Sequence, residues 1–145
     1  KEGIYREMME HLRAHFEESL AAFRRERGRA AKRVLRLCDD LFSVFLRHTE
    51  YVRLMYSIYF GPTQGAPFVD AEAFYDKLYK AVRQAVQQGI RAGEFRRGDP
   101  DDMTLAILGA LTTAIEGHLA RTPVLIGNRG LARILNVILC GIEAH

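Results

Sequence analysis

The chain has 145 residues, of which 48% are hydrophobic, so one globular domain with a buried core accounts for its length. Its formal net charge of +3 arises from 21 Lys and Arg against 18 Asp and Glu, a surplus too small to indicate nucleic-acid binding by this segment. The longest uncharged apolar stretch, residues 103–115, is too short to cross a bilayer, and we therefore expect a soluble, cytoplasmic protein.

Hydrophobic residues recur at helical spacing from the first turn, which predicts a first helix from near Gly3 to about Glu26. Ile4, Tyr5 and Met8 belong to this apolar stripe, although no capping residue precedes them. An apolar first turn normally packs against another segment. We therefore expect the chain to be the back part of a longer protein, with an ordinary frayed helix start as the alternative.

Helical spacing and chain breakers predict five further helices, and hence an all-α fold of about six helices. The second helix is expected after Gly28, and the third over residues 50–60, with Thr49 as its cap. The stretch GPTQGAPF, residues 61–68, is predicted to be a loop because its glycines and prolines interrupt both helix and strand.

The fourth helix is predicted over about residues 70–92, and Gly93 suits a left-handed C-terminal cap. A fifth helix should run to Arg121, where Thr122-Pro123 follows. At its start, Asp99 is suited to be the N-cap and Pro100 the first helical residue, which needs no backbone N–H.

The fifth helix and the sixth, which is expected after Asn128 and through Ile142, have little polar cover. A helix that is apolar on several sides must be enclosed on several sides. We therefore expect a symmetric homodimer in which the last two helices form a four-helix bundle between subunits. The alternative is a well-buried hairpin within one chain. The expected interface residues are Leu108, Leu111, Thr112, Ile115, Leu119, Ile134, Leu135, Ile138 and Ile142.

Aromatic residues are concentrated in the second and third helices and recur in the fourth. Buried phenols need hydrogen-bond partners, and small-molecule pockets are apolar with a few polar groups. The pattern predicts a cavity between helices two to five for a small, mostly hydrophobic effector, with simple core packing as the alternative. The expected lining residues are Phe42, Phe45, Tyr51, Met55, Tyr56, Tyr59, Phe60, Tyr75, Tyr79 and His118.

Few residues suggest metal or catalytic chemistry. His11 and His15 lie one helical turn apart with Glu7 a turn earlier, but the Glu of an H-E-x-x-H site is missing, and a solvated polar face is expected. Cys38 and Cys140 lie in apolar helical segments and are expected to be core thiols of a reducing compartment. Nucleophile and nucleotide-binding motifs are absent, so we expect neither catalysis nor a cofactor or metal.

Three stretches resemble the TetR family of transcriptional repressors. KEGIYREMMEHL resembles the F-x-S-K-E-x-L-Y-x-x-V-x-x-H segment that closes the family's DNA-binding domain. RAGEFRRGDPDDMTLAILGALTTAIEGHL is similar to the G-x-[LF]-R-x-x-D-P-x-x-x-A-x-x-L-x-x-x-x-x-G region where its dimerisation helix starts. RHTEYVRLMYSIYFGP is similar to the family's H-P-E-x-x-R-L-x-x-x-x-F-x-P pattern, with Thr49 in place of the usual proline.

This resemblance implies that residues 1–145 are an effector-binding and dimerisation domain, with residues 1–26 as the helix linking it to a helix-turn-helix absent from this chain. Operator DNA would then be bound only through that missing domain, which Ile4, Tyr5 and Met8 would contact. A ligand would displace the first helix and reset the separation of two recognition helices.

Two other functions remain open. The first is a helical dimerisation or adaptor domain with a packed aromatic core and no ligand. The second, more distant, is a small helical enzyme or metal binder that uses His11, His15 or His118.

Overall fold

The predicted all-α fold is confirmed. The computed structural model describes residues 2–60, 71–119 and 126–144, with the backbone alone at residues 2, 5, 58–60, 71 and 72. Within these ranges the chain forms helices and no strand. The helices are α1 (Glu2–Arg25), α2 (Ala30–Arg47), α3 (Thr49–Phe60), α4 (Ala71–Arg91), α5 (Pro100–Leu119) and α6 (Asn128–Ile142).

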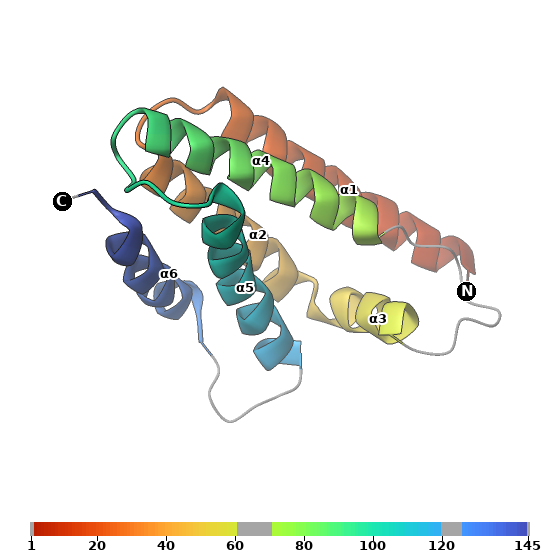
Figure 1. Ribbon diagram of the computed structural model, residues 1–145. Helices are drawn as coiled ribbons and strands as arrows, with labels where there is room; N and C mark the ends of the chain where they lie inside the picture. The colour runs from red at the N-terminus through yellow and green to blue at the C-terminus, as the bar shows by residue number, and fades with distance from the viewer. Residues whose placement is uncertain (1, 61–70, 120–125, 145) are drawn as a thin grey trace.

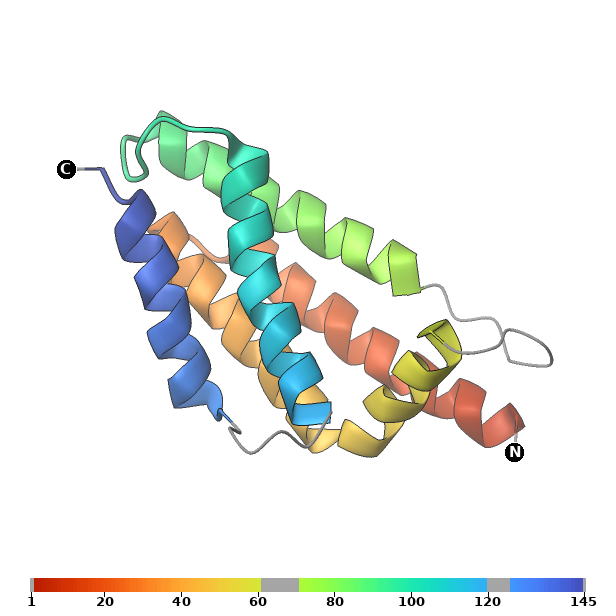
Figure 2. The same cartoon turned by 60° about the horizontal axis from the view of Figure 1, so that its bottom comes forward.

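The helix α2 lies at the centre of the molecule and contacts α1, α4, α5 and α6 (Figure 1). The long helices α1 and α4 cover one side of it, whereas α5 and α6 lie side by side on another (Figure 2). The short helix α3 packs against α2 and α5. Several large side chains between these helices are almost fully buried, among them Leu20, Leu37, Leu41, Phe42, Phe95, Ile107, Leu108, Leu131, Leu135 and Leu139.

The predicted helix boundaries that fall on described residues agree with the observed ones to within two residues, and the predicted end of the fifth helix at Arg121 lies outside those residues. One predicted cap was wrong. Thr49 is itself the first residue of α3, and its hydroxyl donates to the carbonyls of Leu46 (2.9 Å) and Phe45 (3.3 Å), so it closes the end of α2 instead. The predicted loop over residues 61–68 and the stop at Thr122-Pro123 lie outside the described residues.

The turn between α4 and α5 reverses the chain tightly. Gly93 has φ of 74°, which confirms the predicted left-handed cap. The turn sends Phe95 back under α4, where its side chain is buried beside Gly89. A Cβ at Gly89 would lie 2.6 Å from the Phe95 ring, so this close approach requires glycine at position 89.

The start of α5 follows its sequence signals. Asp99 accepts a hydrogen bond of 2.8 Å from the amide of Asp101, which confirms it as the cap, and Pro100 is the first helical residue. The Asp101 carboxylate in turn accepts from Tyr79 and from Nε of Arg83 (2.8 Å), both on α4. These bonds join the first turn of α5 to the side of α4.

The end of α6 is joined to the α4–α5 turn by backbone pairing. The amide of Arg96 donates to the carbonyl of Ile142 (2.8 Å), and the amide of Ala144 donates to the carbonyl of Glu94 (3.1 Å). The side chain of Asn128, at the other end of α6, donates to Asp39 of α2 (2.7 Å). Both ends of α6 are therefore held by polar contacts to the body of the domain.

The two cysteines occupy different environments. Cys38 is fully buried in α2, and burial, with a smaller contribution from Asp39, raises the pKa of its thiol to about 12. Cys140 is exposed on α6, so the prediction of two core thiols was wrong for Cys140. Among the described residues, no helix combines the length and apolar character that a membrane span requires.

Candidate ligand-binding cavity

A cavity of about 720 Å³ lies between α1, α2, α3, α4 and α5. Small-molecule sites typically measure about 300–1,000 Å³, so this cavity has the size to hold a ligand. Most of its wall is apolar, and the apolar lining residues are Leu12, Phe16, Leu41, Val44, Phe45, Met55, Ala73, Phe74, Leu78, Leu111 and Ile115.

The first helix supplies one wall of this cavity. Leu12 and Phe16 lie one turn apart on α1, and both are buried. The Phe16 ring contacts the Phe74 ring of α4, with centroids 5.3 Å apart. A ligand that enlarged the cavity would therefore press directly on α1.

The polar groups of the cavity wall are hydroxyls and carboxylates: Tyr56, Tyr75, Asp76, Thr112 and Glu116. No Lys, Arg or His is among the described lining residues. Burial raises the pKa of Tyr56, and the negative charge of Glu116 raises it further. Asp76 is paired with Lys80 at 2.8 Å. Glu116 also lines the cavity, and its negative charge reaches the Tyr56 hydroxyl there. The cavity thus suits a neutral or cationic apolar molecule better than an anion.

The structure brings four of the ten predicted lining residues together on this wall: Phe45, Met55, Tyr56 and Tyr75. They extend from α2, α3 and α4, as the aromatic pattern predicted. The side chains of Tyr59 and Phe60 lie outside the described residues.

The other four predicted lining residues lie elsewhere. Phe42 is fully buried in the core and is not among the residues that line the cavity. Tyr79 is hydrogen-bonded to Asp101, and Tyr51 lies beside His48 in a separate hollow. His118 is partly buried near the end of α5, and its Nδ1 has no hydrogen-bond partner among the described residues.

The lining residues of α1 were not predicted from the sequence, and those of α5 were predicted to lie at a dimer interface. Leu12 and Phe16 belong to the apolar stripe of α1, and that periodicity could have indicated an inward wall. Leu111, Thr112 and Ile115 were expected at a dimer interface, but they face the cavity of their own chain.

The face of α5 and α6 that a second chain could reach differs from the predicted one. The expected interface residues Leu108, Leu111, Ile115, Leu135 and Ile142 are buried inside a single chain, while Thr112, Leu119 and Ile138 are half-buried. The large apolar side chains left open on these two helices are Leu105 (53% exposed), Ile134 (41%) and Val137 (75%). Ile134 is therefore the predicted interface residue that remains well exposed.

The predicted contact with a preceding domain falls on the start of α1. Ile4 is 65% exposed and Met8 is half-buried beside His48. The side chain of Tyr5 lies outside the described residues.

No model of a known protein family matches this sequence, and no curated protein matches it. Among solved structures, the chain is similar to a protein with unknown function from Rhodococcus sp. RHA1, with a TM-score of 0.68 and 18% sequence identity. The match covers 97% of this chain and 70% of that one. At this identity, the similarity extends to the fold alone.

Proposed function

We propose that the chain is the effector-binding and dimerisation domain of a TetR-like transcriptional repressor. The observation that carries this proposal is the cavity of about 720 Å³ whose wall includes the first helix. The sequence resemblance makes that helix the link to a DNA-binding helix-turn-helix. A ligand in the cavity would thus contact α1, the helix that would pass the effect of binding to the DNA-binding domain.

The proposed mechanism begins at Phe16. Its ring lines the cavity and contacts the Phe74 ring of α4, with the centroids 5.3 Å apart, so a ligand that displaces the Phe16 ring tilts α1 relative to α4. In a dimer, tilting both first helices changes the distance between two recognition helices, which must fit half-sites about 34 Å apart. Ligand binding and operator binding are then coupled through one rigid helix.

Dimerisation in this proposal uses the open face of α5 and α6. Leu105, Ile134 and Val137 place apolar surface there. Gly109 and Gly141 lie in these helices with open space around the position of a Cβ, so a second chain can approach closely.

The effector class follows from the cavity wall. Apolar side chains dominate it, and the Glu116 carboxylate, with no Lys, Arg or His among the described lining residues, favours a neutral or positively charged ligand. The alternative adaptor function requires that no such ligand binds.

A thermal-shift comparison of three ligands of one shape tests the proposal: naphthylmethylamine, naphthylmethanol and naphthoate. We expect the amine and the alcohol to raise the melting temperature, since a ligand at 100 times its Kd stabilises the fold by about 2.7 kcal/mol. A Thr112→Trp variant, which fills the cavity from α5, should lose the shift while remaining folded. If a wider panel of hydrophobic molecules also leaves the melting temperature unchanged, the adaptor function replaces the proposed one.

The DNA-binding half of the proposal has a separate test. The coding sequence upstream of Lys1 should encode a helix-turn-helix pattern within about fifty residues. A coding sequence without that pattern would overturn the TetR-like assignment and leave the cavity's ligand binding to be judged by the thermal shifts.

A further inference from the structure

Three of the chain's five histidines meet at one place, away from the cavity. His11 and His15 lie one turn apart on α1, with their Nε2 atoms 3.2 Å apart. His48, which lies between α2 and α3, brings its ring to within 5.6 and 5.8 Å of theirs, centroid to centroid. One ring nitrogen from each histidine lies within 4.8 Å of the other two.

These separations are close to those of a metal site. Zn²⁺ binds histidine nitrogen at about 2.0–2.1 Å in tetrahedral geometry, which places two ligand nitrogens about 3.4 Å apart. The pair on α1 already meets that spacing at 3.2 Å. His48 reaches it with a movement of about 1.4 Å at the ring, which a side-chain rotation supplies.

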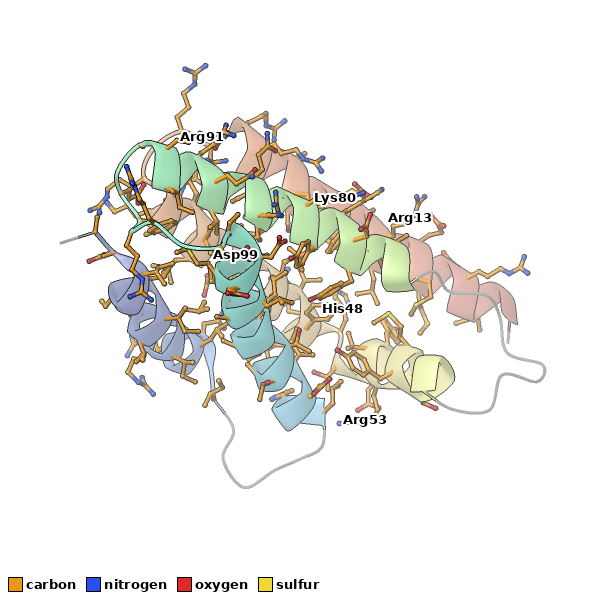
Figure 3. The ribbon with its side chains drawn as sticks, viewed as in Figure 1. Arg13, His48, Arg53, Lys80, Arg91 and Asp99 are labelled. Atoms are coloured by element: carbon orange, nitrogen blue, oxygen red, sulfur yellow. The ribbon has the colours of Figure 1, made fainter. Side chains whose placement is uncertain are left out.

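The backbone of His48 is held in place by hydrogen bonds. Its amide donates to the carbonyls of Val44 (3.2 Å) and Phe45 (3.3 Å), and its own carbonyl accepts from the amides of Tyr51 and Val52, both at 3.0 Å. His48 therefore occupies a fixed corner between two helices (Figure 3). Its ring stacks on Tyr51 with an interplanar angle of 16°.

The surroundings favour a cation and an uncharged His48 ring. Glu7, Glu10 and Glu50 line the same hollow as His11 and His48, with Arg47 as the opposing charge. Burial lowers the pKa of His48, and the positive charges of the other two histidines and of Arg47 lower it further. A lowered pKa keeps a lone pair available for a metal at neutral pH.

We propose that His11, His15 and His48 bind a divalent transition-metal ion of the Zn²⁺ class and thereby fasten α1 to the α2–α3 junction. Two histidines a turn apart are common on helix surfaces. His48 lies 33 residues after His15 in the sequence and makes this a three-ligand site. Glu10 and Glu50 are paired with Arg13 and Arg53, so Glu7 or water is the fourth ligand.

This site goes beyond the proposed effector function and does not depend on it. It also departs from the solvated polar face that the sequence favoured for His11 and His15. The sequence could not indicate the three-histidine site, because His48 lies at the α2–α3 junction, whereas His11 and His15 lie on α1.

Titration calorimetry with Zn²⁺ and visible absorption with Co²⁺ test the proposal on protein without a polyhistidine tag. We expect one ion per chain, a tetrahedral Co²⁺ spectrum, and a rise in melting temperature that a chelator reverses. His48→Ala should weaken binding by at least about tenfold and abolish the tetrahedral spectrum.

His118→Ala is the matched control, because His118 lies on α5 outside the cluster and should leave binding unchanged. His48→Gln provides a second variant with a polar side chain, and circular dichroism without metal checks that each variant is folded. Binding of equal strength in wild type and His48→Ala would overturn the proposal, as would the absence of one-to-one binding. Neither result bears on the effector cavity, since no effector is present.

Discussion

Glu94, in the turn between α4 and α5, caps α2 by accepting a hydrogen bond of 2.8 Å from the backbone amide of Ala30. Its other carboxylate oxygen accepts from the amide of Ala31 at 3.0 Å, and Arg29 lies 3.5 Å away. Arg29 occupies the N-cap position, but its side chain makes no capping hydrogen bond to α2. The central helix thus takes its cap from a residue 64 positions away along the chain.

Replacing Glu94 with Ala should lower the free energy of unfolding by about 1–3 kcal/mol, because two partly buried amides lose a charged acceptor. Urea unfolding measures the loss. The control is Glu10→Ala, which removes an exposed ion pair with Arg13 and should change the free energy of unfolding far less. Similar losses in the two variants would contradict the capping role.

Gly89→Ala should destabilise the protein, although alanine is the better helix former. The new Cβ would lie 2.6 Å and 2.8 Å from two carbons of the buried Phe95 ring, and such overpacking costs about 1–3 kcal/mol. Thermal unfolding measures the effect. Gly3→Ala is the control, since it is also helical and has nothing within 4 Å of its Cβ position. A gain in stability at position 89 would show that Phe95 is not held against α4.

Tyr79 should ionise late in a pH titration. Its hydrogen bond to Asp101, followed by burial, raises its pKa from 10.0 to about 12. Because the folded pKa is the higher one, the stabilisation is complete below about pH 10 and is lost as the pH rises towards about 12. Ultraviolet absorption of phenolate follows this titration, and Tyr79→Phe should remove its last step.

The same bonds, from Arg83 first and then from Tyr79, lower the pKa of Asp101 below its ordinary value of 3.8. A lowered carboxylate pKa gives stability that is present above pH 3.8 and is lost as the pH falls through the folded value. The melting temperature of Asp101→Asn should therefore lie below that of wild type at neutral pH and approach it in acid. A difference that stays constant below pH 3.8 would refute the coupling.

Glu116→Gln should change which ligands the cavity prefers. Glu116 is the lining carboxylate whose charge raises the pKa of Tyr56, and the amide removes that charge. We expect naphthylmethylamine to lose affinity relative to naphthylmethanol, with naphthoate gaining, as measured by thermal shifts or calorimetry. Asp102→Asn is a matched control on the same helix outside the cavity wall. An unchanged order of affinities would mean that Glu116 does not select for charge.

Val137→Asp should break the proposed dimer without unfolding the chain. Val137 is 75% exposed on α6, so the charge meets water in a monomer but would be buried between two chains. Sedimentation at micromolar protein measures the change. Leu54→Asp is the control, because Leu54 is 40% exposed on α3, away from the proposed interface. A wild-type chain that sediments as a monomer would remove the dimer from the proposal.

The sequence predicted the helices well because their signals are local. Gly93 and Asp99 act over a few bonds, and the structure uses each in the predicted way. Glu94 could not be predicted as the cap of α2, since its partner Ala30 is distant along the chain and no local pattern links them.

The faces of α5 were the weakest prediction, for a related reason. Apolar residues surround this helix, so periodicity marks no single inward side. Leu108 and Leu111 were placed at a dimer interface, but they pack within their own chain, and Leu105 is left exposed. The proximity of His48 to His11 and His15 could not be predicted either, because it depends on how α1 packs against α2.

The geometry of α1 makes it a lever arm. From Phe23, buried at one end, to Ile4, exposed at the other, a straight helix measures about 28 Å at 1.5 Å per residue. A tilt of about 5° around Phe23 would carry Ile4 roughly 2.5 Å. A small displacement at Phe16 is therefore magnified at the amino-terminal end of α1, so the proposed effector would have to move Phe16 only slightly to shift that end by a larger distance.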